Sequence, residues 1–163
     1  MRTIPVFILV LVFSASIYAQ EGTIDGIYKE YYANGGLKVE GNYKGGKKEG
    51  VFREYSEEGI LMAERTYKAD KLTGVSKEFR ANGNLNLECE LNDGRPAGFC
   101  REYYESGALL RGWDYRNSKG GTVMVKEYYA DGALAASMVY KDNLLTGVKR
   151  YDRNGKLMLE ENH

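Results

Sequence analysis

The sequence predicts an all-β protein, an elongated antiparallel β-meander built from about six 24-residue hairpin repeats. Three observations predict this fold. The 163-residue chain contains 20 glycines but only 2 prolines, and the glycine share is well above the usual value of about 7%. It also contains 14 tyrosines, and tyrosine is enriched in strands. Finally, an aromatic–glycine motif recurs at nearly constant intervals along the chain.

Residues 1–19 are predicted to be a signal peptide and are set aside from the fold. Arg2 precedes the apolar run Val6–Phe13, and small residues lead to a cleavage site after Ala19. The apolar run is shorter than the roughly 20 residues that span a membrane. Cleavage after Ala15 and an uncleaved N-terminal anchor are the alternatives. We therefore expect export to the periplasm, the cell envelope or the extracellular space, with a short linker at 20–25 and a repeat domain at 26–163.

Each repeat contains an aromatic residue followed four positions later by glycine. The aromatics are Tyr31, Tyr55, Phe79, Tyr103, Tyr128 and Tyr151. The glycines are Gly35, Gly59, Gly83, Gly107, Gly132 and Gly155, separated by steps of 24, 24, 24, 25 and 23 residues. Leucine lies two positions after each glycine, at Leu37, Leu61, Leu85, Leu109, Leu134 and Leu157. This regularity predicts about six copies of one structural unit.

Each unit is interpreted as two strands and two turns. The first turn, called the tip turn here, carries dipeptides such as Asn34-Gly35, and Asn-Gly between apolar segments is a strong hairpin signal. The second turn is also glycine-bearing or polar, as in Gly45-Gly46. A helix is disfavoured because interior glycines cost about 1 kcal/mol each. About twelve strands are expected, and isolated hairpins would be marginal, so the units must stabilise one another.

Register and core follow less directly from the repeat. A second aromatic position lies twelve residues after the first, at Tyr43, Tyr67, Leu91, Tyr115 and Tyr140. Most of these residues are followed seven positions later by glycine, so we expect cross-strand pairs that cover glycine with a ring. The expected pairs are Tyr43 with Gly50, Tyr67 with Gly74, Leu91 with Gly98 and Tyr140 with Gly147. The aromatics that precede the tip turns, Tyr31 to Tyr151 in the series above, are called the tip aromatics. The expected core consists of these tip aromatics, the six repeat leucines and the second aromatic positions.

One unit resembles a known repeat almost in full. The segment Gly26-Ile-Tyr-Lys-Glu-Tyr31-Tyr-Ala-Asn34-Gly35-Gly-Leu37, followed by Tyr43-Lys-Gly-Gly-Lys47-Lys-Glu-Gly50, resembles the bacterial variant of the MORN repeat. Proteins of this kind are grouped as the YwqK-like antitoxin family. The resemblance covers about residues 26–163 and implies an interaction module that binds a protein. An exported chain would require an exported toxin as that partner. Two units depart from the pattern, at Leu91 and at the segment Tyr115–Gly121.

Several residues are candidates for binding or cross-linking. Cys89 and Cys100, the only cysteines, flank a predicted turn, and they face each other if Leu91 faces Gly98. Export to an oxidising compartment then favours a disulfide, and two free buried thiols are the alternative. Adjacent strand residues point to opposite faces, so one member of each doubled aromatic is expected to be exposed. The binding candidates are therefore Tyr32, Tyr104 and Tyr129, together with the only tryptophan, Trp113.

The composition favours some functions over others. The 23 basic and 23 acidic residues balance, which argues against a nucleic-acid partner and gives no strong membrane-surface signal. The single histidine is terminal, and no motif predicts a catalytic site, metal or cofactor, although the irregular segment 113–122 leaves room for a pocket. We expect a non-enzymatic protein-interaction module, antitoxin-like by resemblance. The alternative is an envelope glycan-binding or structural β-repeat protein, and similarities to choline-binding and Tyr-Asp repeats are weaker.

Overall fold

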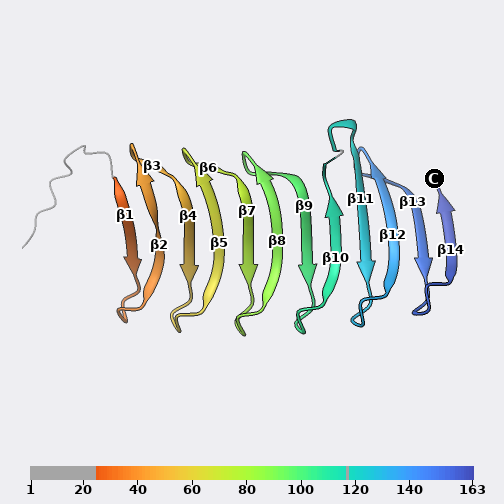
Figure 1. Ribbon diagram of the computed structural model, residues 1–163, viewed down its shortest axis with the longest axis horizontal. Helices are drawn as coiled ribbons and strands as arrows, with labels where there is room; N and C mark the ends of the chain where they lie inside the picture. Colours follow the sequence, from red (N-terminus) through yellow and green to blue (C-terminus); the bar gives the residue numbers. More distant parts are fainter. Residues whose placement is uncertain (1–24, 117) are drawn as a thin grey trace, which may run out of the picture.

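The computed structural model describes residues 25–116 and 118–163. Within them the chain forms one long antiparallel sheet that runs from β1 to β14 (Figure 1). The predicted signal peptide and most of the predicted linker lie outside the described residues. The strands are β1 (Gly26–Tyr31), β2 (Leu37–Lys44), β3 (Lys47–Lys48), β4 (Gly50–Tyr55), β5 (Leu61–Lys68), β6 (Lys71–Leu72), β7 (Gly74–Phe79), β8 (Leu85–Asn92), β9 (Arg95–Tyr103), β10 (Leu109–Asp114), β11 (Thr122–Tyr128), β12 (Leu134–Lys141), β13 (Leu144–Tyr151) and β14 (Leu157–Asn162).

The predicted fold class is confirmed. The main path through the sheet, in the described part of the chain, contains twelve strands. The two-residue strands β3 and β6 lie off this path and pair with β2 and β5. The tip turns lie together along one side of the sheet, as Figure 1 shows. In the first of them Gly35 has a φ of 85° and donates its N–H to the carbonyl oxygen of Tyr32 at 3.0 Å. This left-handed conformation carries no steric penalty for glycine, which is why the repeat places glycine there.

The predicted glycine–tyrosine register is wrong. Tyr43 lies opposite Gly26 in β1 and Lys48 in β3, and Gly50 lies opposite Tyr67. The expected Leu91–Gly98 and Tyr140–Gly147 pairs are absent as well, because Leu91 pairs with Pro96 and Tyr140 with Leu145. Gly26, Gly50 and Gly74 instead pair with the second aromatic position across the tip hairpin, at Tyr43, Tyr67 and Leu91. The seven-residue spacing spans the second turn, where β3, β6 and register shifts alter the pairing.

The predicted core is also wrong. The buried apolar residues in the described chain are Phe52, Ala63, Cys100, Val125, Ala136 and Val148. None of them is a tip aromatic, a repeat leucine or a second-position aromatic, and Tyr31 is 56% exposed. The reason is that a single layer has no second layer to cover either face. Only side chains in the middle of a strand, flanked by neighbours on both sides, are shielded.

All six buried residues lie on one face of the sheet, which we call the aromatic face. Cross-strand pairing places Cys100 beside Trp113 and Trp113 beside Val125 on this face. In the first units Tyr28, Tyr43, Phe52 and Tyr67 form a continuous series of edge-to-face contacts, with ring centroids 5.3–5.5 Å apart. The ring of Phe52 lies over Gly41, where an added Cβ would overlap it. An aromatic ring thus covers a strand glycine, as expected, but the pair is Phe52 and Gly41.

Candidate functional site

The opposite face carries a row of alternating charge, and we call it the charged face. One residue from each of the twelve main strands occupies this row, and neighbouring members are cross-strand partners. In order they are Lys29, Glu40, Arg53, Glu64, Lys77, Glu88, Arg101, Gly112, Lys126, Ser137, Lys149 and Glu160. We call this set the charge row. In five units the basic residue of the row is followed in the sequence by a glutamate, at Glu30, Glu54, Glu78, Glu102 and Glu127. Because successive strand residues alternate, these glutamates lie on the aromatic face.

The first half of the charge row shows how a carboxylate is held between two bases. Glu40 lies 3.8 Å from Lys29 Nζ and 3.9 Å from Arg53, while Arg53 Nε is 2.9 Å from Glu64. One arginine therefore contacts carboxylates on both sides. The hydroxyl of Tyr55, a tip aromatic, also donates to Glu40 at 2.9 Å. Glu40 is thus held by two bases and a tyrosine hydroxyl.

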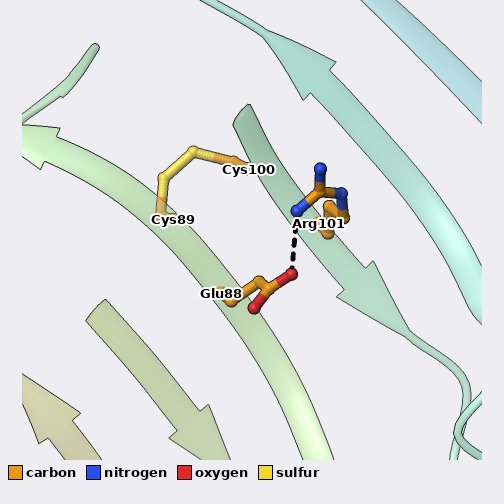
Figure 2. Close-up of a disulfide and its surroundings, with 4 residues drawn as sticks. All are labelled: Glu88, Cys89, Cys100 and Arg101. Carbon is orange, nitrogen blue, oxygen red and sulfur yellow. Dashed lines mark hydrogen bonds and ion pairs between the residues drawn. A yellow bond between two sulfur atoms is a disulfide. The ribbon is translucent and has the colours of Figure 1, made fainter. Parts of the chain in front are cut away.

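Glu88 of β8 shows a similar arrangement with residues of β9. Arg101 donates to Glu88 Oε1 at 2.9 Å, as Figure 2 shows, and the Tyr103 hydroxyl donates to the same oxygen at 2.8 Å. Burial and the bond to Glu88 raise the pKa of Tyr103 to about 12. Burial alone would raise the pKa of Glu88, but the bonds from Tyr103 and Arg101 outweigh it, and the pKa lies below its ordinary value. The site therefore favours an ionised carboxylate beside a neutral phenol.

The charge row is interrupted at Gly112. Of the five equivalent positions in the other units, four hold glutamate, at Glu40, Glu64, Glu88 and Glu160, and one holds Ser137. At Gly112 the sheet instead has a hollow of about 320 Å³. Its lining includes Phe99, Arg101, Gly112, Met124, Lys126 and Tyr128. A Cβ added at Gly112 would meet only the Cys100 carbonyl oxygen, at 3.9 Å, so the space is open to a side chain.

An apolar row runs beside the charge row on the same face. Its exposed members are Ile27 (82%), Val51 (40%), Val75 (43%), Met124 (44%) and Val139 (39%). Polar side chains, among them Asn42 and Thr66, stand between several of them. With strands about 4.8 Å apart, twelve strands extend this surface over roughly 50 Å. The charged face therefore presents a long strip in which apolar side chains alternate with polar ones, bordered by the charge row.

The aromatic face has its own hollow, of about 440 Å³, around Trp113. Trp113, Tyr115 and Tyr140 line it, and Val125 and Met138 belong to the same wall. Arg111 lies 5.7 Å from the centre of the Trp113 ring and forms a 2.6 Å ion pair with Glu127. Both hollows adjoin the segment 113–122, where the sequence departs from the repeat. The candidate residue Trp113 thus lies in the unit whose second turn departs from the repeat.

The tyrosine candidates are placed differently from the expectation. Tyr32, Tyr104 and Tyr129 are half-buried. Their hydroxyl groups donate to the carbonyl oxygens of Tyr55, Tyr128 and Tyr151 at 2.6, 2.9 and 2.9 Å. Arg80 makes the equivalent bond to the Tyr103 carbonyl at 2.7 Å. The expectation of exposed rings is wrong, because each side chain reaches across to the next unit and its polar end bonds the backbone there.

Cys89 and Cys100 form a disulfide across β8 and β9 (Figure 2). They are direct cross-strand partners with Cα atoms 4.0 Å apart. The prediction of facing cysteines is confirmed, but its basis is not, because Leu91 pairs with Pro96 and a register shift lies between Cys89 and Leu91. The disulfide lies on the aromatic face, next to Trp113.

Sequence reasoning missed Gly112, Lys126 and Tyr128 as a group. The signal was present, because the third residue after each repeat leucine is glutamate in four units, serine in one and glycine in this one. It acquires meaning only when the pairing places Arg101 and Lys126 on either side of Gly112. Within residues 25–116 and 118–163, no cluster of three or more His, Cys, Asp or Glu could hold a metal ion. The same residues contain no helix long and apolar enough to cross a membrane.

Comparison with known proteins gives one result. Residues 24–44 and 48–69 match the family model of the MORN repeat variant. No curated protein matches the chain. Each matched segment contains one tip hairpin, β1–β2 in the first and β4–β5 in the second. The first two units are therefore similar to MORN variant repeats, and the meander of hairpins is consistent with a repeat protein that has a binding role.

Proposed function

We propose that this chain is an exported, non-enzymatic protein-interaction module that binds its partner on the charged face. The observation that supports it best is the apolar strip bordered by the charge row. Protein interfaces combine apolar contacts with polar and charged groups. Export rests on the leader sequence, and an antitoxin-like or immunity-like role rests on the family resemblance. The partner in that role is an exported toxin.

Capture with paired variants tests the interface. The full chain, expressed with a C-terminal tag, is used to capture proteins from cell-envelope extract, and recovered partners are cross-linked to map the contact. Val75→Lys introduces a charge into the exposed apolar row, whereas Ala130→Lys introduces the same charge at an exposed tip turn. We expect Val75→Lys to abolish capture and Ala130→Lys to retain it. Failure to recover any specific partner, or equal capture by both variants, would contradict the proposal.

Export is tested separately. Fractionation of cells expressing the chain, followed by N-terminal sequencing of the mature protein, should place it outside the cytoplasm and identify cleavage after Ala19. A cytoplasmic chain that retains Met1 would contradict export without bearing on the interface.

A further inference from the structure

The repeat itself provides a template for what the hollow at Gly112 can bind. At Glu40 and Glu88 a glutamate carboxylate lies beside basic residues of the neighbouring strands and accepts a hydrogen bond from a tip tyrosine. The hollow retains the equivalents of these groups, since Arg101 and Lys126 flank Gly112 and Tyr128 lines the same space. Only the carboxylate is missing.

The groups around the hollow are suited to a ligand of negative charge. Arg101 engages Glu88 through Nη1 at 2.9 Å, and Arg53 shows that an arginine of the charge row can contact carboxylates on both sides. Lys126 is exposed, and its partners in the row are Gly112 and Ser137. Arg116, also in the lining, is paired with Asp114 at 2.7 Å. The lining therefore has three cations and one carboxylate.

Apolar atoms complete the site. Phe99, Leu109 and Met124 belong to the lining. The guanidinium groups of Arg116 and Arg101 lie 4.1 Å and 5.2 Å from the centre of the Phe99 ring. A ligand carboxylate would thus meet the cations while its methylene groups lie against apolar side chains. Met124 also belongs to the exposed apolar row, so the hollow opens within the proposed interface.

We propose that the hollow over Gly112 binds a carboxylate, namely a glutamate or aspartate side chain that the protein partner inserts in place of the missing glutamate. This inference rests on the proposed function for the source of the carboxylate. The site is itself a property of the free chain, so it can be tested without the partner.

The first experiment supplies the carboxylate from the chain. Gly112→Glu is compared with Gly112→Gln, which has nearly the same shape but no charge, and each is combined with Lys126→Gln. We expect the glutamate variant to have the higher Tm, and we expect Lys126→Gln or 1 M salt to reduce the difference. Equal Tm values for the two variants would overturn the proposal.

The second experiment supplies the carboxylate from outside. Isotope-labelled wild-type chain is titrated with glutamate blocked at both ends, and the blocked glutamine analogue is the control. We expect saturable NMR shifts confined to residues around β10 and β11 for the glutamate compound, with binding lost in Gly112→Glu and retained in Lys44→Gln. Equal shifts for both compounds, or none, would overturn the proposal.

The two proposals can fail separately. If the first two experiments fail while Val75→Lys still abolishes capture, the interface stands and the carboxylate site falls. If the two carboxylate experiments succeed and no partner is captured, the carboxylate site is supported, but its assignment to a protein ligand is contradicted. With a partner in hand, Lys126→Gln should weaken its binding by about tenfold or more, since a hydrogen bond to a charged group contributes roughly 1.5–3 kcal/mol.

Discussion

At the scale of single residues, the glutamates of the charge row are held by more than surface ion pairs. An exposed pair alone contributes about 0–1 kcal/mol. Glu88, however, accepts bonds from both Arg101 and Tyr103 on one oxygen, and its side chain is only 20% exposed. Bonds that involve an ionised partner are shorter and stronger than neutral ones. We therefore expect Glu88 and its partners to stabilise the centre of the sheet.

Tyr103 should make the stability of the fold depend on pH in the alkaline range. Its pKa is raised from the ordinary 10 to about 12 in the folded chain, so its contribution is complete below pH 10 and is lost as pH rises through about 12. Tyr103→Phe should lose about 1.5–3 kcal/mol at pH 8, since a hydrogen bond to a charged group is removed. Denaturant unfolding from pH 8 upward should show the gap between wild type and variant narrowing above pH 10. A gap that stays constant would show that the Tyr103–Glu88 bond does not stabilise the fold.

Glycine has opposite roles at two strand positions. A Cβ at Gly41 would overlap the ring of Phe52, which is 3% exposed and is held between Tyr43 and Tyr67. At Gly112 there is room for a side chain. Gly41 is therefore needed for packing on the aromatic face, whereas Gly112 leaves a space on the charged face.

At the scale of strands and hairpins, β8 and β9 are the pair joined covalently. The Cys89–Cys100 disulfide closes a loop with a sequence separation of 11 residues. A cross-link of this kind restricts the unfolded chain and stabilises the fold by about 2–3 kcal/mol in the loop-entropy model. It adjoins the interrupted unit, where β9 leads into β10.

Reduction of the Cys89–Cys100 disulfide should therefore lower the free energy of unfolding by about 2–3 kcal/mol. Guanidinium unfolding with and without reductant measures the change. A Cys89→Ala/Cys100→Ala double variant should match the reduced wild type and be insensitive to reductant. Identical midpoints for oxidised and reduced wild type would show that the disulfide adds nothing to stability.

The connection between β10 and β11 distinguishes one unit from the others. Most second turns are two residues long, as at Gly45-Gly46 and Asp142-Asn143. The connection between β10 and β11 instead covers residues 115–121 and includes the 3₁₀ turn Ser118–Gly120. The Asp142 N–H donates to the Gly121 carbonyl oxygen at 2.8 Å, which ties the longer connection to the following turn. Both hollows lie beside this connection, so the candidate sites occur where the sequence departs from the repeat.

At the scale of the whole molecule, each strand of the main path pairs only with its neighbours on that path, and the two outer strands have one such neighbour each. All six residues of β14 are exposed, whereas strands near the middle include buried side chains. Stability in such an array is approximately a sum over units and their interfaces. We therefore expect unfolding to begin at the ends of the sheet.

Hydrogen exchange measures this gradient. Amides of β8 and β9 should be protected longest, because they have neighbours on both sides and the disulfide, and those of β1 and β14 should exchange fastest. The disulfide double variant should reduce the difference without reversing it. Uniform protection along the chain would instead show that the sheet unfolds as a single cooperative unit.

The fold class and the order of the strands follow from local sequence, because glycine at each tip turn and alternating apolar segments specify hairpins independently of distant contacts. The facing cysteines could be predicted as well, although for an incorrect register. Which side chains are buried could not be predicted, since burial depends on the sheet having one layer. The hydrogen bonds from Tyr32, Tyr104 and Tyr129 to the backbone of the next unit could not be predicted either. Likewise Gly112 is an ordinary glycine in the sequence. Only the pairing of β9, β10 and β11 places it between Arg101 and Lys126, because cross-strand neighbours come from separate units and their register is set by the turns between them.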